Sequence, residues 1–520
     1  MTYCLTKSKL QAFVQCPKKL WLTQHAPEKT HLGDAMQMVL DRGNRFGEMA
    51  RSTFPEGQWI TPKDPVQAVR ETTAMLAAIE QGAARRPLFE AAFAQDDTVI
   101  RVDVLLPDPQ GAGWTLIEVK SGQLREKDGA FKLHLLQDIA IQAYVLMKNG
   151  VHLTGIELAG PRKSFVYRQA GDYNGLIERV DVTQALQSLV AKTSILIESA
   201  AQTLASSTVP EKSVGPQCTV PHTCEFLARC TGAQAAPGED ISVPVWTLGG
   251  TPIVKVVKGL LDAGIRDLAE APDHLLTEPI HLKMRSVARG EVSQFVNPAL
   301  VTHLRSQPWP RYFLDYEDIT GSPYPLFIGT SSAGRMPFQF SVHEWPSPNE
   351  PIRHHEFLWD EVSDPRIPLG QALLKAIGRV EGGVYTWAGK SVEGPVTDKL
   401  AEKFSGKQKD ALLWIARQCR DADLLPLFRQ QLFLKGMQSW SVKSIAQNLL
   451  ATNPYDGLRI RNGASAMQQY EQMIGAAPGA DRETTRQNLL KYCAVDTQVL
   501  ILIWSALTGE QVQFPSVSQH

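Results

Sequence analysis

Two acids and a lysine near residue 110 are the residues whose types and spacing best fit catalysis. Asp103 lies in the apolar run Val-Ile-Arg-Val-Asp-Val-Leu-Leu, and Glu118 and Lys120 close the run Trp-Thr-Leu-Ile-Glu-Val-Lys. Residues two apart on a strand project from the same face, and an antiparallel neighbour can bring Asp103 within reach of Glu118 and Lys120. Carboxylates bind Mg²⁺ or Mn²⁺, and a lysine beside them can orient the water that attacks a phosphate. The alternative interpretation is an exposed hairpin with ordinary charges.

Strands and helices must position these side chains, and the flanking sequence predicts them. Pro107 to Gly113 has the proline and glycine content of a hairpin turn between two strands. Downstream, His134, Asp138 and Gln142 recur every four residues, which predicts a helix with one polar stripe and an apolar opposite face. Upstream, the segment around Glu48 also predicts a helix. Such a polar stripe is otherwise a solvated helix face.

The cysteines give an independent indication of a metal site. Seven cysteines in 520 residues, an odd number without a signal peptide, argue against a disulfide scaffold. Three of them follow the spacing Cys218-x5-Cys224-x5-Cys230, and Cys16 precedes the strands in Gln-Cys-Pro-Lys-Lys-Leu-Trp-Leu. Four thiolates can bind zinc, although structural zinc sites usually contain shorter Cys-x2–4-Cys spacings. The alternative is a set of unrelated buried cysteines.

The second half of the chain carries another set of acids. Asp315 and Glu317 end the apolar run Arg-Tyr-Phe-Leu-Asp-Tyr-Glu, and Tyr492 precedes Asp496 by four residues, on one face of a predicted helix. Between them, Glu393 follows the strand-like run Gly-Val-Tyr-Thr-Trp. Two metal ions held by such carboxylates can stabilise the attacking and leaving oxygens of a phosphodiester. Asp423 is a further acid that could contribute.

The first set of residues resembles the PD-(D/E)xK nucleases of the RecB-like branch, which includes the CRISPR-adaptation and AddAB-type nucleases. The resemblance implies Glu48, Asp103 and Glu118 as metal ligands, Lys120 as the water-orienting group and Gln142 as a positioning residue. The usual Gln-x-x-x-Tyr motif is not met, because Tyr144 follows Gln142 by two residues.

The cysteine order is also that of RecB-like nucleases with an iron–sulfur cluster, which have one cysteine before the nuclease core and three after it. This resemblance implies a [4Fe–4S] cluster on Cys16, Cys218, Cys224 and Cys230. The cluster would tie the first helix of the chain to the end of its domain.

The second set resembles the tyrosine subclass of the DEDD exonucleases, which have an RNase H-like fold. There the resemblance implies Asp315, Glu317 and Asp496 as metal ligands and Tyr492 as the residue that orients water. The middle motif departs from the family pattern, since Glu393 stands for the usual aspartate and the asparagine is missing. Over its full length the chain resembles a prokaryotic family that joins a RecB-like iron–sulfur nuclease domain to a DEDD-like one.

Composition sets limits on the class of protein. The chain is 43% hydrophobic and 21% charged, which is a globular composition, and its N-terminus and short apolar runs predict a cytoplasmic protein without a membrane span. A net charge of −1 gives no global basic signature, so contact with nucleic acid would depend on local patches. The lysines and arginines concerned are Lys7, Lys9, Lys18, Lys19, Lys120, Arg125, Lys127 and Lys132.

These observations predict an α/β protein of three parts. A restriction-endonuclease-like domain at 1–235 is followed by a helical connector at 236–306 and an RNase H-like exonuclease domain at 307–515, with strands expected at 312–314, 326–329 and 338–342. The expected function is a Mg²⁺- or Mn²⁺-dependent nuclease acting on DNA ends or single strands in repair, recombination or defence. No P-loop is evident, so a helicase or defence-system partner would supply any unwinding. The alternatives are an RNA-processing nuclease, a nucleic-acid-binding scaffold with a degenerate second site, and an iron–sulfur redox sensor.

Overall fold

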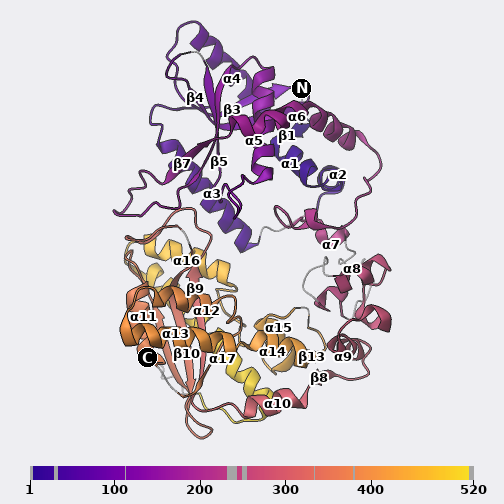
Figure 1. Ribbon diagram of the computed structural model, residues 1–520, viewed down its shortest axis with the longest axis vertical. Helices are drawn as coiled ribbons and strands as arrows, with labels where there is room; N and C mark the ends of the chain where they lie inside the picture. Colours follow the sequence, from indigo (N-terminus) through magenta and orange to yellow (C-terminus); the bar gives the residue numbers. More distant parts are fainter. Residues whose placement is uncertain are drawn as a thin grey trace. The chain divides into compact units, whose positions relative to one another are not determined.

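The protein is a mixed α/β chain with several sheets. The computed structural model describes residues 4–28, 33–111, 113–230, 243–248, 255–332, 334–378, 381–437 and 439–514. The chain divides into two compact units, one formed by residues 1–230 with 322–325 and the other by residues 231–321 and 326–520 (Figure 1). The predicted linker at 231–243 lies outside the described residues except for Val243.

A mixed β-sheet is the centre of the first unit. Its order is β2-β3-β4-β5-β6-β7, and β1 adds to β4 in parallel. The two strands predicted around the first acids are confirmed, and they pair antiparallel with Val104 opposite Ile117. The strands are β1 (Leu5–Thr6), β2 (Gln58–Trp59), β3 (Leu88–Gln95), β4 (Thr98–Pro107), β5 (Trp114–Val119), β6 (Leu153–Pro161) and β7 (Ile177–Asp181).

Helices bury the apolar side chains of this sheet. The predicted helix around Gln142 is α5, whose Ile139, Ala143 and Leu146 pack in one core with strand residues such as Val102. The helices of the unit are α1 (Lys7–Gln15), α2 (Pro17–His25), α3 (Asp34–Ser52), α4 (Pro65–Glu80), α5 (Leu133–Lys148), α6 (Thr183–Ala205) and α7 (Leu227–Cys230), with a 3₁₀ turn at Pro216–Cys218.

The second unit is built on another mixed sheet, with order β11-β10-β9-β12. Strands β9, β10 and β11 are antiparallel neighbours, and β12 runs parallel to β9. The predicted strands at 312–314 and 338–342 lie in β9 (Arg311–Ile319) and β10 (Met336–Trp345), while β11 is Arg353–Leu358 and β12 is Gly383–Tyr385. The strand expected at 326–329 is wrong, because this segment forms a single bridge from Ile328 to Ser363 and no strand.

Side chains alternate across β9 and divide the second unit into layers. Tyr312, Leu314 and Tyr316 pack against α11 (Arg366–Ala376), α12 (Glu393–Ala401) and α13 (Gly406–Asp421). Phe313 packs on the opposite side, in a core with α17 (Ala480–Thr508) (Figure 1). Asp315 and Glu317 follow the alternation of Phe313, so the fold turns both acids toward α17.

The remaining elements of the second unit surround this sandwich. Residues 243–306, which include most of the predicted connector, cluster with the second unit, and their Val245, Leu260 and Met284 share its core. These elements are α8 (Lys255–Asp262), α9 (Pro279–Ala288), β8 (Gln294–Val296), α10 (Pro298–Arg305), α14 (Leu424–Gln431), β13 (Leu432–Leu434), α15 (Val442–Leu449) and α16 (Gly463–Gly475), with 3₁₀ turns at Val245–Leu248, Leu268–Glu270 and Asp273–Leu275.

One helix of the described chain, α17, is long and apolar enough to cross a bilayer by composition alone. Most of its apolar stretch is buried inside the unit, where Val499, Ile501 and Trp504 belong to the core. Its composition is therefore that of a core helix.

Candidate metal centres

The first centre forms where β4 and β5 separate. The pairing of β3 with β4 skips Glu90 and Asp103, and Glu90 has a φ of 57°. Val102 and Leu105 both belong to the core under α5, whereas Val104 belongs to another cluster, so the alternation of side chains shifts at Asp103. The Asp103 carboxylate accepts a hydrogen bond from the backbone N–H of Val119 at 2.7 Å. This bond fixes the acid beside the end of β5.

Glu118 is the hub of the first centre. It is 1% exposed, and its Oε1 accepts a hydrogen bond from Lys120 Nζ at 2.7 Å. Its Oε2 accepts one from Gln142 Nε2 at 2.8 Å. The structure thus brings together four of the predicted residues, Asp103, Glu118, Lys120 and Gln142.

Two residues of this centre were not predicted as part of it. Asp138, one turn before Gln142 on α5, accepts a hydrogen bond from Lys120. Lys7, the first residue of α1, donates to Glu118 Oε1 at 2.8 Å and lies 3.9 Å from Asp138 Oδ2. The i, i+4 relation of Asp138 to Gln142 was a usable signal for the acid. No local spacing pointed to Lys7, because it is 111 residues from Glu118.

Burial and charge set the ionisation of the first centre. Burial, strengthened by the Glu118 charge, raises the pKa of Asp103 to about 7. Burial acts in the same direction on Glu118, but the Lys7 and Lys120 ammonium groups outweigh it and lower the pKa of that carboxyl. Burial and Glu118 raise the pKa of Asp138. The centre therefore holds one ionised glutamate beside two carboxyls that retain protons more readily than usual.

Oxygen atoms remain available in the first centre. Asp138 Oδ1 and Gln142 Oε1 are buried without a hydrogen-bond partner. Buried acceptors without partners cost free energy, and a bound cation is one of the few groups that can satisfy several of them at once. The all-oxygen donor set is the one that Mg²⁺ and Mn²⁺ prefer.

Glu48 lies on α3 and is exposed to solvent. A side chain added at Gly43 of this helix would come within 3.7 Å of Ser121 Oγ, so α3 passes the chain just beyond Lys120. Among the described contacts of Asp103, Glu118 and Lys120, none involves Glu48. Its assignment as a metal ligand stays a prediction.

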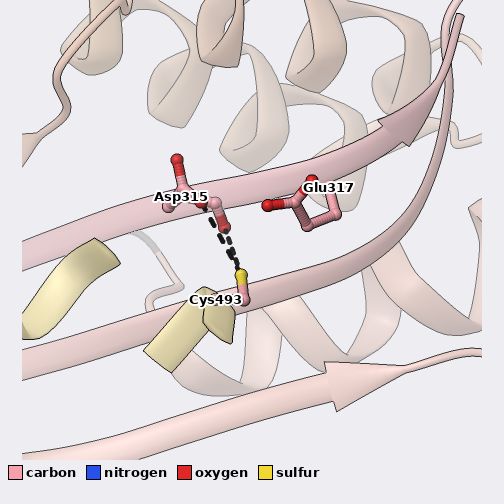
Figure 2. Close-up of side chains that lie close together, drawn as sticks. All are labelled: Asp315, Glu317 and Cys493. Atoms are coloured by element: carbon pink, nitrogen blue, oxygen red, sulfur yellow. Dashed lines mark hydrogen bonds between the residues drawn. The ribbon is translucent and has the colours of Figure 1, made fainter. Parts of the chain in front are cut away.

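The second centre lies between β9 and α17. Ligand atoms of Asp315, Glu317 and Cys493 all lie within 4.8 Å of one another, and Cys493 Sγ is 3.7 Å from Asp315 Oδ2. Figure 2 shows the two acids projecting from the strand toward the cysteine on the helix. Gly463, the first residue of α16, lies beside Glu317, because a Cβ there would stand 3.6 Å from Oε2, an ordinary van der Waals contact.

Helix α17 contributes the other predicted residues of the second centre. Asp496 Oδ1 accepts a hydrogen bond from Tyr455 at 2.7 Å, and Tyr492 also hydrogen-bonds this acid. Lys443 donates to the Tyr492 hydroxyl at 3.1 Å. Tyr455 and Lys443 were not predicted, and each reaches the centre from a segment more than 35 residues away in the chain.

The middle acid is Glu393, at the start of α12. It is 3% exposed, and its Oε2 has no hydrogen-bond partner. Its charge contributes to raising the pKa of Asp315, but its carboxylate is not part of the close group formed by Asp315, Glu317 and Cys493. Asp423, the other acid considered, has a structural role: its carboxylate accepts from the backbone N–H groups of Lys390 at 3.0 Å and Leu425 at 3.1 Å and caps α14.

The acids of the second centre are largely buried and have few positive charges near them. Burial and the neighbouring Asp496 raise the pKa values of Asp315 and Glu317 well above their usual range. Burial raises the pKa of Glu393 to about 7, and burial also raises that of Asp496. These four carboxyls therefore retain protons more readily than usual, and Asp315 and Glu317 form a close group with Cys493.

The four predicted cysteines line one small cavity in the first unit. Its volume is about 20 Å³, and Cys16, Cys218, Cys224 and Cys230 all face it. Burial raises the pKa values of the Cys224 and Cys230 thiols. Among the described residues, no three of these cysteine sulfurs lie within 4.8 Å of one another, in contrast to the ligand atoms of Asp315, Glu317 and Cys493.

Part of the second unit is similar to a described family. Residues 312–441 match the family model described as a domain of unknown function (DUF2779). The match covers Asp315, Glu317 and Glu393, and it ends before Tyr492 and Asp496. A comparison with curated proteins gives no match. The description of the matching family assigns no activity, so the function must be argued from the two centres.

Proposed function

We propose that this protein is a divalent-metal-dependent nuclease that hydrolyses phosphodiester bonds of DNA, with one reaction centre in each unit. The observation that carries the proposal is the convergence of Asp103, Glu118, Lys120 and Gln142 into one hydrogen-bonded cluster. Lys120 Nζ lies 2.7 Å from the Glu118 carboxylate and 2.5 Å from that of Asp138, and Asp103 is bonded to the backbone of the neighbouring Val119. Carboxylates can hold a metal, and the lysine can contact a phosphate or orient a water.

In the first centre, Asp103, Glu118 and the free Asp138 Oδ1 would hold Mg²⁺ or Mn²⁺. The ion supplies charge stabilisation to the attacked phosphate when it is bound. Gln142 donates to Glu118 Oε2 and so restrains the rotamer of a carboxylate that would be a ligand of the ion. Lys120 lies against both Glu118 and Asp138, where its ammonium can orient water or contact the phosphate.

In the second centre, Asp315, Glu317, Glu393 and Asp496 would hold metal ions of the same class. The unpartnered Glu393 Oε2 and the raised pKa values of its neighbours fit a site that is completed by cations. Tyr455 orients Asp496, and Lys443 orients Tyr492, whose hydroxyl can position the attacking water.

Folds of the two units support the same proposal. The acids of the first unit lie on paired strands under a helix that carries the glutamine, as in RecB-like PD-(D/E)xK nucleases. In the second unit, the acid pair lies on an inner strand of a mixed sheet and the tyrosine and last acid lie on a late helix, as in RNase H-like DEDD exonucleases. We assign the protein to the cytoplasm and to DNA ends or single strands, with a helicase or defence-system partner for unwinding.

The four cysteines that line the cavity are the proposed ligands of an iron–sulfur cluster. Four thiolates bound to one zinc ion at ~2.3 Å would stand about 3.8 Å apart. No three of the described cysteine sulfurs lie within 4.8 Å of one another, so the preference for a [4Fe–4S] cluster over zinc rests on the spacing and order of the cysteines in the chain. We therefore propose Cys16, Cys218, Cys224 and Cys230 as ligands of such a cluster, which would join the α1–α2 segment to the end of the unit.

Cleavage of end-labelled substrates tests the proposal. Protein purified without oxygen is incubated with single- and double-stranded DNA and with RNA, in Mg²⁺, Mn²⁺ or a chelator. Metal-dependent shortening of DNA is the expected result, and cutting of RNA alone would reassign the substrate. Binding without cleavage in every metal would overturn the enzyme and leave a nucleic-acid-binding scaffold.

A further inference from the structure

Lys7 occupies the first centre without having been assigned a role there. Its ammonium donates to Glu118 Oε1, the same oxygen that accepts from Lys120, and lies 3.9 Å from Asp138. Two cations on one carboxylate oxygen exceed what charge balance at a single glutamate requires. The positive charge of Lys7 therefore balances the carboxylates of the centre together, including that of Asp138.

Strand pairing explains how a residue so far away in sequence reaches this place. β1 pairs with the first residues of β4, Thr98 and Val99, on the edge that β5 uses farther along. β3 pairs with the opposite edge of β4 over the same residues. β1 therefore lies on the edge of β4 that β5 leaves after Ile117. Lys7 follows β1 directly and so enters the gap between the two strands.

The same helix connects Lys7 with the cysteine cavity. α1 runs from Lys7 to Gln15, and Cys16 is its C-terminal cap. The end of the helix is held by Gln15 Nε2, which donates to the backbone carbonyls of Gln217 at 2.9 Å and His222 at 2.7 Å. Both carbonyls lie in the loop that carries Cys218 and Cys224. A rigid helix of nine residues, about 13 Å long, thus has one end in each site.

We propose that Lys7 is a charge-balancing residue of the first centre and that the cysteine site sets its position through α1. The inference rests on the proposed function, because it assumes that the first centre binds a divalent ion. Loosening the cysteine loop would release the C-terminal end of α1 and let Lys7 leave the carboxylates. A change at the four cysteines would then alter the charge in the first centre through Lys7, without any change in Asp103, Glu118 or Lys120.

Removal of the Lys7 charge should change metal binding and cleavage in opposite directions. Lys7 competes with a divalent ion for Glu118 Oε1, so its removal strengthens metal binding. It also supplies a cation to the phosphate, so its removal weakens cleavage. At distances near 4 Å and an effective dielectric constant near 20, the Coulomb interaction corresponds to an effect of up to about a thousandfold, so about tenfold is the smallest change expected of each. Simple damage to the fold would weaken both binding and cleavage.

Metal titration and cleavage assays on the full chain test the role of Lys7. Mn²⁺ binding is measured by calorimetry in an Asp315→Asn background, which impairs the second centre. Lys7→Gln is expected to bind Mn²⁺ about tenfold more tightly and to cleave about tenfold more slowly, and Lys7→Arg is expected to restore both values toward those of the unsubstituted lysine. Lys9→Gln is the matched control for Mn²⁺ binding, because Lys9 lies on the same helix and bonds to the Cys4 carbonyl instead.

A double-mutant cycle tests the coupling to the cysteine site. Cys16→Ser, or Gln15→Ala if the serine variant does not fold, is expected to tighten Mn²⁺ binding and slow cleavage in the same directions as Lys7→Gln. Neither change should add to the effect of Lys7→Gln. Cys4→Ser is the control, since Cys4 is exposed and does not line the cavity. Iron content per chain is measured for each variant.

The outcomes separate this inference from the proposed function. Unchanged or weaker Mn²⁺ binding by Lys7→Gln, with binding lost in Asp103→Asn, would overturn the role of Lys7 and leave the metal centre intact. Equal effects of Cys16→Ser or Gln15→Ala with and without Lys7 would overturn the coupling through α1. Unchanged Mn²⁺ binding by Asp103→Asn would refute the proposed metal centre itself, and therefore also the role of Lys7.

Discussion

Replacement of Glu393 by glutamine should stabilise the protein in the absence of metal and weaken its binding of metal. Glutamine has nearly the same shape and carries no charge, so the change removes one ionisable group from a site where Glu393 is 3% exposed. Burial raises the pKa of this carboxyl from 4.5 to about 7. The folded protein therefore holds a proton that the unfolded chain releases as the pH rises above 4.5, and the glutamate costs stability above that pH.

The magnitude follows from the same values. At about 1.4 kcal/mol for each pH unit between 4.5 and 7, the cost of Glu393 grows to about 3 kcal/mol at pH 8 and vanishes near pH 4. Glu393→Gln should thus raise the stability of the metal-free protein by up to about 3 kcal/mol at pH 8, with little effect near pH 4. Mn²⁺ should stabilise the wild type more than the variant, because the variant lacks one ligand.

Urea unfolding at pH 5 and pH 8, with chelator and with Mn²⁺, measures both effects. Glu402→Gln, at the other end of α12, is the control, since Glu402 is exposed and paired with Lys399. A Glu393→Gln variant that is less stable than the wild type at both pH values would refute the reasoning. It would mean that the carboxylate is satisfied in the folded protein without a cation.

Other substitutions test separate parts of the account. Lys120→Met should reduce cleavage by the first centre by about 100-fold or more, while calorimetry should show Mn²⁺ binding retained or strengthened. Tyr455→Phe removes the hydrogen bond to Asp496 and should cost roughly 1 kcal/mol of transition-state stabilisation in the second centre, seen as a several-fold fall in kcat with little change in KM. Cys224→Ser should abolish the visible absorption and iron content of anaerobically purified protein, whereas Cys4→Ser should leave both unchanged.

Much of the first centre could be predicted from local sequence patterns. A period of two places Glu118 beside Lys120, hairpin chemistry brings Asp103 close, and a period of four places Gln142 on α5 with Asp138. Lys7 could not be found in this way, because it depends on the pairing of β1 with β4. Pairing between strands that are far apart in the chain produces no recognisable spacing of residues in the sequence.

The second centre shows the same division. The acid pair on β9 and the tyrosine and acid on α17 follow from strand and helix periodicity, and the structure places them close together. Lys443 and Tyr455 belong to segments whose packing against α17 has no sequence signature of its own. The strand expected at 326–329 failed because its apolar residues, including the buried Phe327, serve a loop packed on the core instead of a sheet.

The most direct test of the central claim compares the DNA products of the wild type, Lys120→Ala and Asp315→Ala in Mn²⁺ under anaerobic conditions. Two working centres predict that each variant loses a different part of the wild-type product pattern and that the double variant cuts nothing. Identical products from all three proteins would contradict the account, because the cleavage would then come from neither carboxylate centre.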